Sequence, residues 1–450
     1  MRKFFTLLLL SSAFYVNGQD FDSSPLLDVN RCELHTAGDF DGDGYVDIVT
    51  GFWNFTSKSN LFFYKNQKTN PVTYVKSDIE SQLPIVSLSR PIDYNQDGDL
   101  DIIYASSTDR TLFAYDNDGK GKFTSKSLNV NGTTVHSGAD MNGDNITDIV
   151  GHNPQNYAVI VYIRDASGVY TTKTLNTNGF KVDEHRIVDT DKDGDIDIVL
   201  SAIGFSDQII IMVNDGKNNY TLTKVLRDGF NSYEQITVGD INNDGLVDIM
   251  GSSSSSVMVL TNKGDNKFNA EIKIDFDTNV SWIGIVTGDL NGDGKQDILS
   301  GGNSRGLYWF KNVSTSLDPK FEKIKISDVI GHSRLSIVDV DNDKDLDIIT
   351  NNNFLFWITN KVKQETSSLS VDSRVNISLY PNPVSHEVII DGLDGDGHSA
   401  LIYNAVGVPV LKADVISNRV DVRSLNAGMY ILQLQDQSGN VVASKQLVIL

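Results

Sequence analysis

Seven copies of a nine-residue acidic cassette recur along this chain, and they limit its fold more strictly than any other feature. The first copy reads DFDGDGYVD from Asp39, and the last reads DVDNDKDLD from Asp339. Asp or Asn stands at positions one, three, five and nine of each copy, which is the spacing of the oxygen ligands in a calcium-binding loop. The carbonyl of position seven would be a further ligand. The sequence therefore predicts up to seven bound calcium ions.

Each cassette contributes four candidate metal ligands. They are Asp39, Asp41, Asp43, Asp47, Asp93, Asn95, Asp97, Asp101, Asp140, Asn142, Asp144, Asp148, Asp189, Asp191, Asp193, Asp197, Asp240, Asn242, Asp244, Asp248, Asp289, Asn291, Asp293, Asp297, Asp339, Asp341, Asp343 and Asp347. Seven equivalent loops suit a structural role for the ions, because catalysis normally needs one asymmetric site. We therefore assign no catalytic residue to them.

The spacing of the cassettes predicts a repeat architecture made of strands. Successive first Asp residues stand 47 to 54 residues apart, a period that fits one four-stranded propeller blade. Two apolar residues follow each final Asp, such as Ile48-Val49, and lead into short alternating runs. The triplet Asn117-Asp118-Gly119 then signals a hairpin turn. We expect an all-β fold, a seven-bladed β-propeller followed by a small β-sandwich.

An EF-hand loop shares the early ligand positions of the cassette, but it is excluded here. An EF-hand needs a bidentate Glu at position twelve, and none of the seven copies has one. An EF-hand also continues into a helix, whereas the apolar pairs after these cassettes predict strands. The cassettes therefore join strands.

These residues resemble the FG-GAP/VCBS repeat family, whose blades carry a D-x-[DN]-x-[DN]-G-x-x-D loop between the first and second strands, as in the integrin α-chain head. The match covers Asp39 to about Phe321 in six complete units, followed by a shortened seventh. The resemblance implies a propeller of calcium-binding blades. Asn145 and Lys344 depart from it, because they replace the Gly at position six, where we expect positive φ. Since Lys tolerates that conformation less well than Asn, the seventh loop is expected to be the weakest metal site.

The seventh unit is short of one strand. The chain enters the polar stretch KVKQETSSLS soon after FLFWITN, while an unassigned segment, FDSSPLLDVN, precedes the first unit. We expect residues 20–30 to supply the outer strand of the seventh blade. This pairing would close the ring and remove the exposed strand edges that an open array would leave.

Charge and the N-terminal segment predict an exported protein. The formal net charge of −21 argues against nucleic acid or an anionic membrane as a partner. Residues 1–18 combine a basic start, an apolar stretch and small residues near the expected cleavage point, so we interpret them as a signal peptide. No other segment approaches the roughly 20 apolar residues of a membrane-spanning helix, and no transmembrane segment is expected.

The calcium period ends before the C-terminal part of the chain. We expect the propeller to span residues 19–362, a polar linker to span 363–372, and a separate all-β module to span 373–450.

The C-terminal module resembles the type A sorting domain of the type IX secretion system in Bacteroidetes, a small β-sandwich. Tyr380-Pro381-Asn382-Pro383 matches its opening motif, and Leu425, Gly428 and Tyr430 match its L-x-x-G-x-Y strand. The resemblance implies recognition by the type IX machinery and delivery to the outer cell surface or the medium. An ordinary carbohydrate-binding sandwich is the alternative.

Positions at which the residue type differs from one repeat to the next predict where a ligand binds. We expect the face opposite the metal loops to bind it, because five residues there combine flat rings with cationic groups. They are Tyr233, Trp282, His332, Arg334 and Arg305. Such groups suit stacking on sugars or clamping of carboxylates, while for any single aromatic residue packing between blades is the favoured alternative. We predict a binding or adhesion module for glycan or protein ligands.

Two other functional classes remain open, because the fold does not decide among them. In a polysaccharide lyase or hydrolase, His136, His152, His185 or His332 would act as acid or base. A purely structural surface protein is the third class. His35, His136 and His185 all stand four residues before their cassettes, so a repeated packing position is the preferred interpretation of these histidines.

Overall fold

Each acidic cassette connects the first two strands of a four-stranded antiparallel sheet. The computed structural model contains seven such sheets in the described residues of its first unit, Met1–Gln364, and a second unit comprises Glu365–Leu450. The described residues are 21–25, 32–54, 58–83, 85–88, 90–106, 111–131, 134–153, 158–203, 208–225, 233–253, 255–276, 282–302, 306–328, 334–351, 355–362, 377–380, 382, 384–392, 398–404, 409–425, 428–435 and 441–449. The predicted signal peptide and linker lie outside them.

Strands are the regular elements throughout the described part of the chain, which confirms the all-β prediction. The first three sheets contain β2 (Cys32–Gly38), β3 (Asp47–Asn54), β4 (Lys58–Asn66) and β5 (Tyr74–Leu83), then β6 (Ile85–Leu88), β7 (Ile102–Ser106), β8 (Thr111–Asn117) and β9 (Phe123–Asn131), then β10 (Thr134–Ala139), β11 (Asp148–His152), β12 (Val159–Arg164) and β13 (Tyr170–Leu175). A search of the same residues finds no helix with the length and apolar character needed to cross a membrane.

The next three sheets repeat this order of strands. They contain β14 (Lys181–Val188), β15 (Asp197–Ile203), β16 (Gln208–Asn214) and β17 (Tyr220–Lys224), then β18 (Tyr233–Gly239), β19 (Asp248–Ser253), β20 (Ser256–Leu260) and β21 (Ile272–Phe276), then β22 (Trp282–Gly288), β23 (Asp297–Gly302), β24 (Leu307–Asn312) and β25 (Phe321–Ser327). Each sheet is thus a meander of consecutive strands.

The seventh sheet takes its outer strand from the other end of the unit. Its order is β1 (Phe21–Pro25), β28 (Leu355–Asn360), β27 (Asp347–Asn351) and β26 (Leu335–Val338). Strand β1 pairs antiparallel with β28, with Phe21 opposite Asn360 and Pro25 opposite Phe356. The predicted outer strand is therefore confirmed for residues 21–25.

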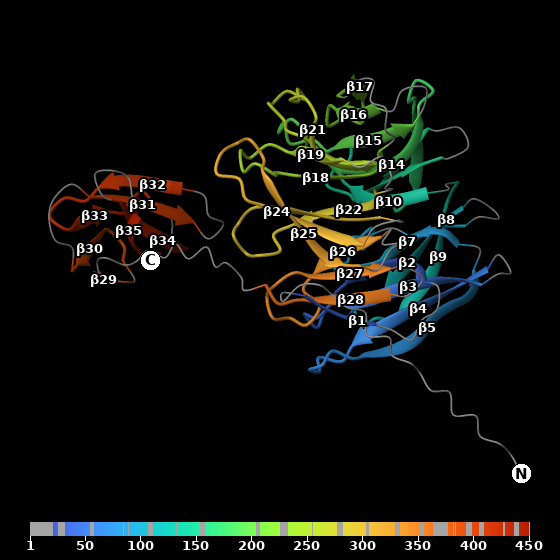
Figure 1. Cartoon of the computed structure of the whole chain (residues 1–450), viewed down its shortest axis with the longest axis horizontal. Helices are drawn as coiled ribbons and strands as arrows, with labels where there is room; N and C mark the ends of the chain where they lie inside the picture. The colour runs from blue at the N-terminus through green and yellow to red at the C-terminus, as the bar shows by residue number, and fades with distance from the viewer. Residues whose placement is uncertain are drawn as a thin grey trace, which may run out of the picture. The chain divides into compact units, whose positions relative to one another are not determined.

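Apolar cores lie between successive sheets and hold them together. Strands β19 and β23 are buried along their whole length, so both faces of their sheets are covered. Among the described residues, each sheet from the first to the sixth shares a buried cluster with the next. A further cluster, containing Ile48, Tyr64, Ile349 and Trp357, joins the seventh sheet to the first. Figure 1 accordingly shows the orange strands β26–β28 beside the blue strands β2–β4.

The cassette loops turn through the left-handed region at two positions. Position six has positive φ in every copy, including Asn145 at 63° and Lys344 at 79°, which confirms the predicted turn. Position four also has positive φ, as at Gln96 and Lys192, although these residues gave no such indication in the sequence. Because Asn and Gly adopt this conformation more readily than Lys, the backbone of the seventh loop carries strain at Lys344.

The second unit has its own apolar core between two sheets. One sheet contains β29 (Ser378–Tyr380), β30 (Glu387–Asp391) and β33 (Arg419–Asp421), and the other contains β32 (Pro409–Asp414), β31 (Ser399–Asn404), β34 (Gly428–Gln435) and β35 (Val441–Ile449). The cluster between them includes Val388, Ile402 and Leu432, all fully buried. This two-sheet arrangement agrees with the expected small β-sandwich.

Candidate metal centres and the cavity between the first strands

The carboxylate of the first Asp in each cassette accepts hydrogen bonds from backbone amides of its own loop. In the first loop, the amide of Asp43 donates to Asp39 Oδ1 at 3.0 Å and the amide of Gly44 donates to Asp39 Oδ2 at 2.8 Å. The same pair of bonds occurs in the sixth and seventh loops. The loop therefore curls around its own carboxylates, and in four cassettes at least three acidic groups have oxygens within 4.8 Å of one another.

In four loops the side chain at position three has a buried oxygen. One oxygen of each of Asp41, Asp191, Asn291 and Asp341 is buried, and it has no hydrogen-bond partner among the described residues. A buried oxygen without a partner is costly, and a cation would satisfy it. Because the donor set consists of carboxylate and amide oxygens, the loops fit a hard divalent cation.

The final Asp of each cassette is buried and joins the loop to a neighbouring strand. In the sixth sheet, Asp297 Oδ1 accepts a bond of 2.7 Å from the amide of Asn312, and Oδ2 accepts one of 3.1 Å from Leu290. Burial raises the pKa of this carboxyl to about 7. Burial likewise raises the pKa of Asp47, Asp101, Asp248 and Asp347 to about 7. A cation in the loop would favour the ionised form of these groups.

In six of the seven sheets, an asparagine side chain connects the sheet to the cassette of the sheet before it. Asn312 Nδ2 donates to the carbonyl of Ile241 at 2.7 Å, in the fifth cassette, and to the carbonyl of Gln296 at 3.0 Å, in its own cassette. The equivalent residues, here called the latch asparagines, are Asn66, Asn117, Asn214, Asn262, Asn312 and Asn360. Asn66 bonds to the carbonyl of Val340 at 3.1 Å and so links the first sheet to the seventh.

Sequence reasoning missed the latch asparagines. Asn117 was assigned to a hairpin turn, and that turn does follow it, since Asn117 pairs with Phe123 at the start of β9. The recurrence of Asn 13 to 19 residues after the final Asp, in six of seven copies, is the signal that could have found them. In the third sheet Arg164 stands at this place, and its backbone amide still donates to Asp148 at 2.8 Å.

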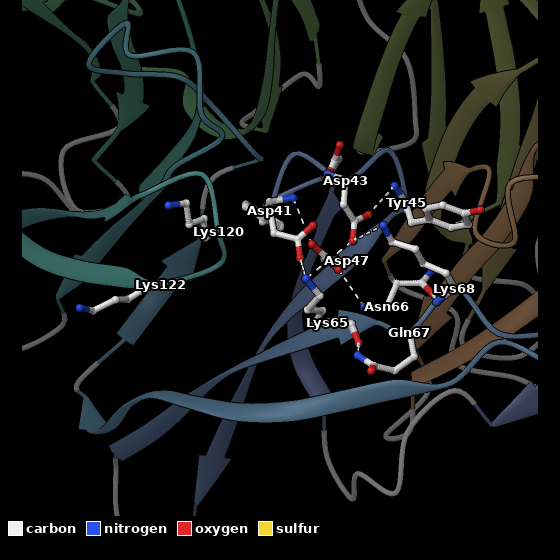
Figure 2. A network of polar contacts seen from close by, with 12 residues as sticks. Asp41, Asp43, Tyr45, Asp47, Lys65, Asn66, Gln67, Lys68, Lys120 and Lys122 are labelled. Atoms are coloured by element: carbon white, nitrogen blue, oxygen red, sulfur yellow. Dashed lines mark hydrogen bonds and ion pairs between the residues drawn. The ribbon is translucent and has the colours of Figure 1, made fainter.

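The first loop differs from the others because two lysines reach into it (Figure 2). Lys65 Nζ forms an ion pair with Asp41 and lies 3.7 Å from Asp43 Oδ2. Lys68 Nζ lies 3.0 Å from the same Asp43 oxygen. Two ammonium groups thus offset part of the negative charge of this loop, and they would compete with a metal ion for its carboxylates.

A separate cavity of about 390 Å³ lies between the first strands of the sheets. Its walls come from β2, β14, β18, β22 and β26 and from residues that follow β6. The polar groups that line it include His35, Arg90, Glu184, Arg186, Gln235 and Arg334. An adjoining cavity of about 420 Å³ shares Arg90 and Arg186 and also contacts β10. Unlike the seven loops, this site is asymmetric.

Of the five residues predicted to bind a ligand, the structure describes the side chains of two. Arg334 lines the cavity. Trp282 is 0% exposed and packs between the fifth and sixth sheets, with its ring 5.6 Å from that of Tyr308, so the expectation of an open stacking platform is wrong. Tyr233 begins β18, but its side chain lies outside the described residues, as do His332 and Arg305.

Three histidines of the first unit have described side chains, and two of them, His152 and His185, are among those considered as acid or base. His35, His152 and His185 are all buried, and the rings of the last two lie 5.7 Å apart. Burial, with a smaller contribution from Arg334, lowers the pKa of His35 to about 3. This environment agrees with the packing interpretation. The side chain of His136 lies outside the described residues.

Comparison with family models identifies both modules. The FG-GAP-like repeat model matches residues 93–151, 189–251, 240–300 and 289–350. The secretion system C-terminal sorting domain model matches residues 378–450. The chain therefore carries four recognised FG-GAP-like repeats and a sorting domain. The sorting domain indicates export through the type IX secretion machinery of Bacteroidetes to the cell surface or beyond, which confirms the predicted localisation.

Similarity to individual proteins is local or remote. A curated relative, beta-agarase D of Zobellia galactanivorans, is 33% identical over 72 residues, which is 16% of this chain and only 15% of the relative. PorZ, a surface component of the type IX secretion system of Porphyromonas gingivalis, is 13% identical with a TM-score of 0.47, over 94% of this chain and 59% of PorZ. A lectin of Agrocybe aegerita that recognises terminal N-acetylglucosamine is 18% identical with a TM-score of 0.46, over 77% of this chain and 95% of the lectin. These values carry no conclusion about function.

Proposed function

We propose that this exported chain of FG-GAP-like repeats is a calcium-stabilised seven-bladed β-propeller that acts as a binding module for glycan or protein ligands outside the cell. Support for the propeller comes from the cyclic packing of the sheets. Each four-stranded sheet shares a core with the next, and the seventh shares one with the first. The bond from Asn66 to Val340 joins the same two sheets.

Support for calcium comes from the chemistry of the loops. The candidate ligands are oxygens, and several at position three are buried without a partner among the described residues. Calcium takes six to eight such ligands in flexible geometry, whereas magnesium needs a near-ideal octahedron and keeps several waters. Seven such loops at equivalent positions of the sheets suit ions that stabilise the fold.

The observation that carries the binding role is the cavity between the first strands. Charged groups from separate sheets meet there, including Glu184, Arg186 and Arg334. Convergent polar groups in a concave site of a few hundred cubic ångströms are typical of ligand sites. Selective binding of a ligand needs an asymmetric site such as this cavity. The metal loops, by contrast, offer seven surfaces of nearly the same chemistry.

A glycan array probed with the chain beginning at residue 19 tests the proposal. The calcium-loaded protein should bind a defined group of saccharides, and chelator should abolish binding as the fold weakens. The same saccharides should be recovered unchanged after incubation. Release of unsaturated or shortened products would contradict a pure binding role and favour the polysaccharide lyase or hydrolase. Absence of binding to any glycan would leave only a protein ligand, to be sought by pull-down from the surface fraction.

A further inference from the structure

The cavity between the first strands is cationic although the chain as a whole is strongly acidic. The formal net charge is −21, yet three guanidinium groups, those of Arg90, Arg186 and Arg334, line this one cavity. Glu184 is the acidic residue among the described lining residues, and it forms an ion pair with Arg186. The described lining residues therefore include three guanidinium groups and one carboxylate.

Two of these guanidinium groups repel each other. The charge of Arg186 is the largest cause that lowers the pKa of Arg90 to about 10, although Arg90 itself is exposed. Arginine normally stays protonated well above this value, so its lowering reflects an unfavourable pair of like charges. Solvent screens part of this repulsion at the exposed Arg90, and an anion between the two guanidinium groups would relieve the rest.

The hydrogen-bonding capacity of the pair is only partly used. Arg186 Nη1 donates to Glu184 and, at 2.8 Å, to the carbonyl of His185. Arg186 Nε is buried and has no hydrogen-bond partner among the described residues. Arg90 is exposed, and it is attracted by Glu184 as well as repelled by Arg186. Guanidinium groups present donors in a planar fork that matches an oxyanion. An oxyanion in the cavity could therefore accept a hydrogen bond from Arg186 Nε.

We propose that this cavity binds the oxyanion group of an acidic ligand, held between Arg90 and Arg186 with Arg334 as a further cation. The inference rests on the proposed binding role and narrows its ligand class to anionic saccharides or other small oxyanion-bearing molecules. A volume of about 390 Å³ lies within the range of small-molecule sites and accommodates one acidic sugar residue.

Calorimetric titration of the calcium-loaded protein with four probes tests this proposal. Glucuronate supplies a carboxylate on a sugar, sulfate and phosphate supply the oxyanion alone, and glucose is the neutral control. Glucuronate should bind, and its affinity should fall with added salt because the contact is between charges. Binding of sulfate or phosphate as well would support recognition of the oxyanion itself. Equal binding of glucose would overturn the proposal.

Variants separate a ligand contact from a structural one. Arg90→Gln should weaken glucuronate binding about tenfold or more, because a charge-assisted hydrogen bond is lost. It should leave the melting temperature of the ligand-free protein unchanged or raised, because it removes the repulsion with Arg186. Arg164→Gln removes the same charge outside the cavity and should bind as the parent does. A lower melting temperature with unaltered binding in Arg90→Gln would make Arg90 structural and overturn the proposal.

Failure of this inference differs from failure of the proposed function. If neutral glycans bind on the array and Arg90→Gln leaves that binding intact, the binding role stands and the anionic class is wrong. If glucuronate binds and responds to Arg90→Gln, both stand. If no probe and no array glycan binds, the oxyanion proposal is overturned together with the glycan-binding role.

Discussion

Removal of one latch asparagine should destabilise the whole first unit, because its amide joins two sheets. Asn312→Ala deletes the bonds to the carbonyls of Ile241 and Gln296, at 2.7 and 3.0 Å, in a position that is 1% exposed. The backbone amide of residue 312 can still donate to Asp297, so the sixth cassette keeps its link to β24. The substitution therefore removes the side-chain latch, together with the bonds that Asn312 Oδ1 accepts from Ser314 at 3.1 and 2.5 Å.

The expected loss in the free energy of unfolding follows from the two carbonyl oxygens that lose their hydrogen-bond donor. Each buried group left without a donor costs about 1–3 kcal/mol, and the bond to the Gln296 carbonyl is only partly buried, so the loss is about 3 kcal/mol in total. Unfolding entropy near 2.1 cal/mol/K per residue gives about 0.7 kcal/mol/K for roughly 340 residues. The melting temperature should fall by about 4 °C. Asn312→Asp should cost more, because it places a carboxylate against both carbonyl oxygens.

Scanning calorimetry in calcium-saturated buffer measures this effect. The matched control is Asn219→Ala, which removes an amide bonded to Asp215 at 2.9 Å on an exposed turn. The control should melt within about 1 °C of the parent, since exposed hydrogen bonds contribute little. If Asn312→Ala melted like the control, or if Asn312→Asp were the milder change, the latch would not hold the sheets together.

Three further perturbations test other parts of the account. Lys65→Gln removes the ammonium group paired with Asp41, so the calcium concentration for half-maximal thermal stabilisation should fall; an increase would show that Lys65 supports the loop. In calcium-free buffer, melting temperature should fall as pH rises from about 5 to 8, because the folded state holds protons on carboxyls of pKa about 7, such as Asp248, that the unfolded state releases near pH 4. Calcium should remove this trend, and a rise with pH without calcium would contradict it. Deletion of residues 373–450 should leave the folded protein in the periplasm, as fractionation would detect, whereas normal surface delivery would refute the sorting role.

The repeated features of the fold could be predicted from the sequence because they are local. The ligand spacing, the turn at position six and the apolar pair after the final Asp all lie within about a dozen residues, so each copy carries its own signal. The pairing of β1 with β28 was predictable from a different kind of regularity. A seventh unit short of a strand needs one, and residues 20–30 belong to no other repeat, so the sequence predicts the pairing that the structure shows.

The positions between sheets could not be predicted in the same way. In a strand such as β23, residues on both faces are buried, so the two-residue alternation does not say which face is open. Trp282 was consequently assigned to a ligand face although it packs between sheets. Arg90 and Arg186 lie 96 positions apart in the sequence and meet only when the first strands converge. No local pattern connects them.

Counting the bound metal tests the central claim most directly. The chain beginning at residue 19, dialysed against about 1 mM calcium, should carry close to seven calcium ions by elemental analysis. At a dissociation constant of about 0.1 mM each, seven ions would stabilise the fold by about 10 kcal/mol, so chelator should lower the melting temperature by more than about 10 °C. A count below one ion per chain, with a melting curve that chelator leaves unchanged, would contradict the account.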